Sequence, residues 1–408
     1  MTATTDIPTP SGHPSARIAS IDVLRGLTMA VMIFVNDLDG VNGLPWWTRH
    51  AKAEQNVMTY VDMVFPFFLF SLGLSLPIAI RQRLKKNPSL PALWGHTLVR
   101  SVCLVVLGVI LANAREGDPA LMHLPSFAWT LLALLGISLY LSVYNGNERH
   151  VALYRSLRIA GLILTIVMLT VFRRITEDGR VAWLDFSYLE ILGLLGCSYF
   201  AVSLLYIPTR RWPWMPTVWF VLLTGFSVLC AARWFVFERH VPLYVWPFGD
   251  GTMAFIAMAG VVTANIFFGE RSGDSPGYKL LVGSCFGIAL LVAGRIFTPL
   301  GISKIRDTPT WGLYSTGAAV LLFTFLFWLC DVRRHTTWAR FVRPAGANTL
   351  LTYLLPDYWF FLISLTGFTW FDSHFNQGLI GTLGAAFFTC VILTLAAQFT
   401  RLRIRLQL

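Results

Sequence analysis

The side chains best suited to chemistry surround one polar loop between two strongly apolar segments. The loop lies within the stretch DLDGVNGLPWWTRHAKAEQNVMTYVDMVFPFF (37–68), which contains His50 and is flanked by Asn36 and Asp62. Histidine titrates near neutral pH, so a poised imidazole can accept or donate a proton during catalysis. Asp62 either orients that imidazole or pairs with an arginine of another helix, and the residues alone leave both roles open. The pattern indicates an acid–base site centred on His50.

A second polar pattern follows one face of the first apolar segment. Asp22, Arg25, Met29, Met32 and Asn36 are separated by steps of three or four residues, which places them on one stripe of a helix. Arg25 and Asn36 are 11 residues apart, or about 16 Å along a helix, which is comparable to an extended pantetheine arm. The alternative is structural: Asp22 pairs with Arg25, and Asn36 caps the end of the helix.

Four further charged residues lie inside apolar segments, where an ionisable side chain is costly and marks a functional candidate. Arg100 lies toward the inner end of its segment and could, with Arg25, bind phosphate groups through charge-assisted hydrogen bonds. Arg233 and Arg295 lie toward outer ends and could, with Asp357, bound an outer polar cavity. The alternative for each arginine is that it extends to the nearer membrane interface.

The elements that must position these residues are predicted to be membrane-spanning helices. Of the 408 residues, 55% are hydrophobic and 13% are charged, about half the charge of a soluble protein. Apolar runs of about 20 residues can cross a bilayer, and without alternation they favour helices over barrel strands. The predicted fold is all-α, a polytopic bundle of about 12 (10–12) transmembrane helices. They are expected near 20–38, 57–80, 93–112, 124–144, 154–172, 187–206, 214–237, 250–268, 279–297, 311–331, 346–367 and 378–399.

The domain organisation is expected to be simple. Residues 1–17 are polar and proline-rich, which predicts a disordered tail, and they lack the pattern of a cleaved signal peptide. Residues 18–408 are expected to form a single transmembrane domain. With the N-terminus in the cytoplasm, roughly twice as many lysines and arginines fall in inner segments as in outer loops. This distribution predicts that both termini are cytoplasmic.

Several classes of function have no support in the sequence. It contains no HExxH, GxSxG or Walker-type motif, so metal-assisted hydrolysis, serine acyl-enzyme chemistry and ATP use are not indicated. The cysteines lack metal-ligand spacing, and no metal is expected. The net charge of +11 is an orientation signal, and no nucleic acid is expected as a partner. A secondary transporter of a sugar or sugar derivative would equally suit twelve spans with buried charges.

Three of these segments resemble a known family in the same order along the chain. SIDVLRGLTMAVMIFVND, RHA and YVDMVFPFFLFSLGLSL are similar to the signature of heparan-α-glucosaminide N-acetyltransferase and its relatives. EILGLLGCSY, DGTMAFIAMAG, GISKIRDTPTWGLYSTG and PAGANTLLTYLLPD resemble its bacterial, NagX-like branch. The resemblance implies a multi-pass enzyme of the bacterial inner (plasma) membrane that moves an acetyl group from acetyl-CoA to the amino group of a glucosamine-like sugar.

The resemblance also implies roles for individual residues. His50 matches the catalytic loop histidine of the family, Asn36 its first-helix asparagine and Asp62 its second-helix aspartate. His50 is then a general base for the sugar amine or a nucleophile that takes the acetyl group itself, and both routes stay open. Asn36 is expected to stabilise the oxyanion. The helical stripe and the charges inside apolar segments supply the other expected roles. Asp22, Arg25, Arg100, Met29 and Met32 are expected to bind acetyl-CoA, and Arg233, Arg295 and Asp357 are expected to bind the sugar.

The chain departs from its lysosomal relatives in two places, which leaves the acceptor sugar open. SFAWTLLAL stands where those relatives have GVLQR, and Tyr353 is followed by Leu354 and Leu355 instead of Gly-His. The expected partners are an amino-sugar substrate and the lipid bilayer, with a second copy of the chain, in a homodimer, as a further candidate.

Overall fold

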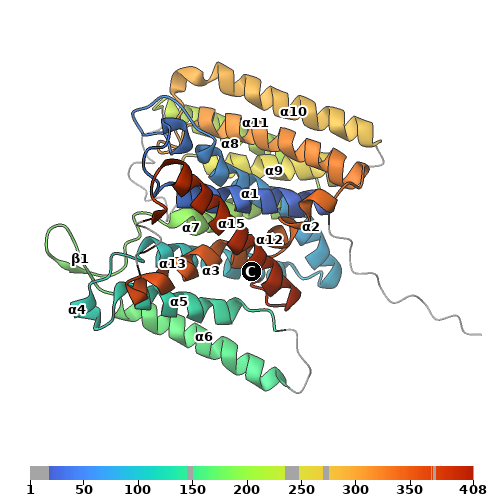
Figure 1. Cartoon of the computed structure of the whole chain (residues 1–408). Coiled ribbons are helices and arrows are strands. Elements are labelled where there is room, and N and C mark those ends of the chain that lie inside the picture. The colour runs from blue at the N-terminus through green and yellow to red at the C-terminus, as the bar shows by residue number, and fades with distance from the viewer. Residues whose placement is uncertain are drawn as a thin grey trace, which may run out of the picture.

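The computed structural model describes residues 18–144, 150–234, 248–269, 275–368, 370 and 374–407, and within them the fold is all-α apart from one short strand pair. It contains twelve helices of at least seven residues, which run side by side in a bundle (Figure 1). The predicted all-α fold is therefore confirmed. The long helices are α1 (Ala19–Leu38), α2 (Val64–Lys86), α3 (Leu90–Ala112), α5 (Ser126–Leu141), α6 (Val151–Val171), α7 (Glu190–Thr209), α8 (Met215–Ala231), α9 (Thr252–Phe268), α10 (Pro276–Ile296), α11 (Pro309–Leu326), α13 (Thr349–Thr366) and α15 (Gly378–Arg401).

Shorter elements connect these helices. Two-residue strands β1 (Arg174–Ile175) and β2 (Val181–Ala182) pair antiparallel between α6 and α7. A π-helical turn (Phe327–Val332) extends α11. The remaining short helices are α4 (Pro119–Met122), α12 (Arg343–Ala347) and the 3-10 turns η1 (Trp46–Thr48), η2 (Val61–Met63), η5 (Thr298–Leu300) and η7 (Thr337–Arg340).

The chain is a polytopic membrane protein. Eight helices of the described residues are long and apolar enough to cross a bilayer, and α5, α8 and α9 are shorter apolar helices. Each of the twelve predicted segments coincides with one long helix. That all twelve cross the membrane, and that both termini are cytoplasmic, stay predictions. The expected tail at 1–17 and the expected end of α8 at 237 lie outside the described residues.

The largest error in a predicted boundary is at α2, which was expected from residue 57 and begins at Val64. The residues before it form a loop that wraps around the Asp62 side chain. Pro66 therefore lies in the first helical turn, where its missing N–H removes no intrahelical hydrogen bond.

Helices approach one another closely where glycines face a backbone. A Cβ atom on Gly73 of α2 would lie 1.7 Å from the carbonyl oxygen of Ala257 in α9. A Cβ atom on Gly260 of α9 would lie 2.2 Å from the carbonyl oxygen of Phe70. Small residues allow such contact between membrane helices, where the lipid supplies little hydrophobic driving force for association. The α2–α9 pair is thus held by packing at backbone distance.

The loop between α1 and α2 is hydrogen-bonded to two other parts of the chain. The N–H of Asn42 donates to the carbonyl oxygen of Asn376 at 2.7 Å, and the N–H of Gly378 donates to the carbonyl oxygen of Asn42 at 2.8 Å. Farther along, Oδ1 of Asn56 accepts from the N–H of Ile302 at 2.5 Å. The loop therefore joins the start of α15 to the connection between α10 and α11.

Replacing Gly73 with valine should destabilise the bundle, because the new side chain overlaps the α9 backbone. Overpacking typically costs about 1–3 kcal/mol, and more where a backbone must move. Gly225→Val in α8 is the matched control, since a Cβ atom there meets nothing within 4 Å. Thermal unfolding of the detergent-solubilised protein should show a lower midpoint for Gly73→Val only. Equal midpoints for the two variants would contradict the packing of α2 on α9.

Candidate active site

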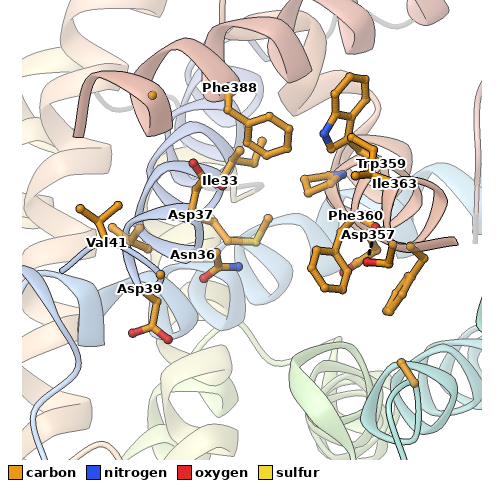
Figure 2. Close-up of a pocket in the computed structure, with 18 of the residues that line it drawn as sticks. Ile33, Asn36, Asp37, Asp39, Val41, Asp357, Trp359, Phe360, Ile363 and Phe388 are labelled. Carbon is orange, nitrogen blue, oxygen red and sulfur yellow. Dashed lines mark hydrogen bonds between the residues drawn. The ribbon is translucent and has the colours of Figure 1, made fainter. Parts of the chain in front are cut away.

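A large cavity lies at the end of the bundle where α1 stops. Its volume is about 1640 Å³, and its walls come from α1, the following loop, the end of α3, the start of α7, α13 and α15. Figure 2 shows Asn36 pointing from α1 into this space, with Phe360 and Trp359 of α13 on the facing side. The volume exceeds that of ordinary small-molecule pockets, so two substrates can meet inside it.

His50 and Asp62 form a hydrogen-bonded pair at the wall of this cavity. The Nδ1 atom of His50 lies 2.7 Å from Oδ1 of Asp62. The imidazole is 42% exposed and lines the cavity, whereas the carboxylate is 1% exposed. An ionised carboxylate can only accept, so Nδ1 carries the hydrogen and the lone pair of the neutral ring is on Nε2. The ring thus has the tautomer in which Nε2 can accept a proton.

The backbone around Asp62 holds the carboxylate in place. Oδ2 of Asp62 accepts from the N–H of Thr59 at 2.9 Å and from the N–H of Ala51 at 3.3 Å. The Thr59 hydroxyl lies 3.2 Å from the same oxygen. The carbonyl oxygen of Asp62 accepts from Nε1 of the fully buried Trp311 in α11 at 3.0 Å. Of the two roles considered for Asp62, the structure shows the one that orients the imidazole.

Lys304 also contacts the imidazole, and sequence reasoning missed it. Its Nζ atom lies 3.4 Å from Nε2 and 3.5 Å from Nδ1 of His50. The turn that presents it is closed by Ser303 and Thr308, whose backbone N–H and hydroxyl lie 3.0 Å apart. Burial lowers the pKa of the Lys304 amine, while the carboxylates of Asp62 and Glu190 act in the opposite direction. The only sequence signal was its place in the family-like segment GISKIRDTPTWGLYSTG.

Glu190 is a second residue of the cavity that was not predicted. It is the first residue of α7 and has a left-handed backbone, with φ of 54°. The hydroxyl of Tyr353 donates to its Oε2 at 3.3 Å, and the N–H of Ile191 donates to the same oxygen. Burial, with the added charge of Glu190, raises the pKa of the neighbouring Tyr188 to about 12. Tyr188 therefore stays a hydroxyl donor at neutral pH.

The structure brings some of the predicted site residues together. Met32, Asn36, His50 and Asp357 line the same cavity, and Asp62 lies directly behind His50. Asp357 comes one turn after Tyr353 on α13 and interacts electrostatically with Glu190. The structure therefore places these five predicted residues at one cavity.

Arg233 and Arg295 are not brought to this cavity, which corrects the predicted outer grouping with Asp357. Both are exposed at the ends of α8 and α10. These helices lie on the opposite side of α1 from α13 (Figure 1). The two arginines were grouped with Asp357 by depth in the membrane, and depth does not determine which helices are neighbours.

The predicted path along α1 is open only in the half of the helix that contains Met32 and Asn36. Met32 lines the cavity but Met29 does not, and Met29 is 3% exposed. Arg25 donates to the hydroxyl of Ser75 in α2, and the backbone of Asp22 is in contact with α12. The continuous polar stripe expected from Arg25 to Asn36 is thus interrupted by packing at Met29.

Arg100 is likewise outside the cavity-lining residues. Its guanidinium lies over the ring of Tyr199 in α7, 4.5 Å from the centroid. The residues expected to bind the two ends of acetyl-CoA are therefore not connected by open space in this structure.

Comparison with known proteins places this chain within a family. Over 97 residues, 24% of the chain, it is 34% identical to the heparan-alpha-glucosaminide N-acetyltransferase of Mus musculus and, over the same length, to that of Homo sapiens. The matched region is 14% of the length of each of these proteins, so the likeness is distant and partial. Residues 17–247 match the family described as "Domain of unknown function (DUF5009)". Because that match covers more than half of the chain, the protein belongs to the DUF5009 family.

Proposed function

We propose that this protein is a membrane-bound N-acetyltransferase that moves the acetyl group of acetyl-CoA to the amino group of glucosamine or a related amino sugar. The observation that carries the proposal is the His50–Asp62 pair, 2.7 Å apart, at the wall of a cavity of about 1640 Å³. A histidine oriented by a buried carboxylate and facing a large cavity is an arrangement suited to general base catalysis. The partial likeness to an N-acetyltransferase supports the same reaction class.

The reaction begins with the proton of the sugar amine. A sugar ammonium has no lone pair, so only the free amine attacks the thioester. Nε2 of His50 accepts the proton as the nitrogen–carbon bond forms, and Asp62 stabilises the imidazolium. The amide of Asn36, which points into the cavity (Figure 2), donates to the developing oxyanion. The carbon–sulfur bond then breaks, and CoA leaves as the thiol after it takes up one proton.

A ping-pong route uses the same residues in another order. Nε2 of His50 attacks the thioester first, and the sugar amine then takes the acetyl group from the ring. Rapid mixing with radiolabelled acetyl-CoA in the absence of sugar distinguishes the routes, because only the ping-pong route leaves label on the protein. Both routes release one CoA for each acetylated amine.

His50→Ala should abolish turnover while the protein stays folded and binds CoA. The measurement is release of free CoA from acetyl-CoA and glucosamine by the purified protein. His123→Ala is the control, because that histidine lies outside the cavity-lining residues. Wild-type activity in folded His50→Ala would rule out the mechanism. Sugar flux into proteoliposomes without acetyl-CoA, in a protein that releases no CoA, would instead identify a transporter.

Asn36→Ala should lower kcat by about 10²–10³-fold, the usual loss for one oxyanion-hole donor. KM for acetyl-CoA should change much less, because the oxyanion exists only in the transition state. Steady-state kinetics on purified protein measure both constants. An unchanged kcat would contradict the oxyanion role and would indicate that Asn36 only caps the end of α1.

We also propose that the protein lies in the bacterial inner membrane with both termini in the cytoplasm, so that the cavity opens on the outer face. Acetyl-CoA would then bind from the cytoplasm, near Arg25 and Arg100, and deliver its acetyl group across the membrane to a sugar from outside. This delivery requires the packing at Met29 to open. The support is the charge distribution and the position of the cavity at the end of α1.

Thiol labelling tests this orientation. Glu54→Cys places a thiol in the exposed loop beside the cavity, and Lys86→Cys places one at the opposite end of α2, both in a variant lacking the native cysteines. In spheroplasts, a membrane-impermeant thiol reagent should label Glu54→Cys at once and Lys86→Cys only after lysis. The reverse pattern would place His50 on the cytoplasmic side and end the cross-membrane version.

A further inference from the structure

The contact between Lys304 and His50 places an amine beside the nitrogen that would accept the substrate's proton. Nζ of Lys304 is 3.4 Å from Nε2 of His50 and lines the cavity. It is presented by a short turn between α10 and α11 that is tied to the loop of His50 through Asn56 and Ile302. Any group that reacts with Nε2 must therefore also lie close to Nζ.

The proposed transfer also requires a proton for the departing sulfur, which His50 or an acid beside it can supply. Breaking the carbon–sulfur bond produces a thiolate, and inside a cavity whose walls are partly apolar an unpaired anion is costly. The sugar amine has meanwhile given a proton to His50. A group that can protonate the sulfur and then recover a proton from His50 would complete the cycle.

We propose that Lys304 is this group, a catalytic acid that gives its proton to the departing CoA thiolate and is reprotonated by His50. The inference rests on the acetyl transfer proposed above. The nitrogen–carbon bond forms as the amine proton passes to Nε2. The carbon–sulfur bond then breaks, the electron pair stays on sulfur, and an Nζ proton moves to that sulfur. The Nε2 proton finally passes to Nζ, so that amine and acetyl-CoA become amide and CoA thiol with no proton gained or lost.

The surroundings of Lys304 fit an acid that must be able to release a proton. Burial lowers its pKa from the usual value of lysine, which brings the amine toward the range where acid catalysis is efficient. The carboxylates of Glu190 and Asp62 interact with it and favour the ammonium form. Glu190 is itself held by the Tyr353 hydroxyl and the Ile191 N–H. Lys304 thus has carboxylates from two elements, α7 and η2, that keep a proton available.

The dependence of the rate on the leaving group tests the proposal. Lys304→Met should lower turnover of acetyl-CoA by about 10²–10⁴-fold, the range of general acid catalysis. With S-(4-nitrophenyl) thioacetate, whose thiolate leaves without protonation, the same variant should lose less than about tenfold. Lys304→Arg keeps the charge but cannot release a proton, so it should be as slow as Lys304→Met with acetyl-CoA. Lys52→Met, on the exposed part of the loop, is the matched control and should match the wild type with both donors.

Chemical rescue separates a proton donor from a charge or a structural support. Lys304→Cys, in the variant lacking native cysteines, should be slow until its thiol reacts with 2-bromoethylamine, which restores a side chain of lysine's length. A trimethylammonium-ethyl group attached to the same thiol has the charge without a transferable proton and should not restore turnover. Rescue by both groups, or by neither, would overturn the acid role, as would equal losses of Lys304→Met with the two donors. A wild-type protein that releases no CoA would instead remove the proposed function, and this inference with it.

Discussion

The architecture of the site depends on how one buried carboxylate is satisfied. Asp62 is 1% exposed, and an ionised carboxylate at such a position costs several kcal/mol unless it is paired and hydrogen-bonded. The imidazole of His50 and the backbone N–H groups of Ala51 and Thr59 together meet that requirement. Since these partners all come from the loop before α2, the loop must fold back over the helix start. The position of His50 is a consequence of that folding.

The helices could be predicted from sequence because each one corresponds to a continuous run of apolar residues. All twelve predicted segments overlap helices, and the largest boundary error, at residue 57, arose where the Asp62 carboxylate draws the chain into a loop. The choice between two roles for Asp62 could not be made locally, because an aspartate one turn into a helix has the same pattern in both. Only the contact between His50 and Asp62 in the structure distinguishes the two roles.

The rest of the site depends on which helices lie next to one another, and the periodicity of the sequence does not predict that. Lys304 lies 254 positions from His50, and in the sequence only its place in the segment GISKIRDTPTWGLYSTG distinguished it. The spacing of the polar residues correctly predicted that α1 is a helix, but it could not predict which neighbouring elements that face contacts. Asn36 meets the cavity, whereas Asp22 meets the backbone of α12 at Gly346. One end of α1 therefore lines the cavity, and its other end packs against α12.

The family match ends at residue 247 and so divides the residues that line the cavity into two groups. Residues 17–247 contain Asn36, His50, Asp62 and Glu190, whereas Lys304, Asp357 and Phe360 come from the remainder. The glycine contacts of α2 with α9 cross the same boundary. The matched region therefore contains only part of the residues that line the cavity. A fragment cut at the edge of the match would keep His50 but lack the opposite wall of the cavity. It would also expose the face of α2 that α9 covers in the intact chain.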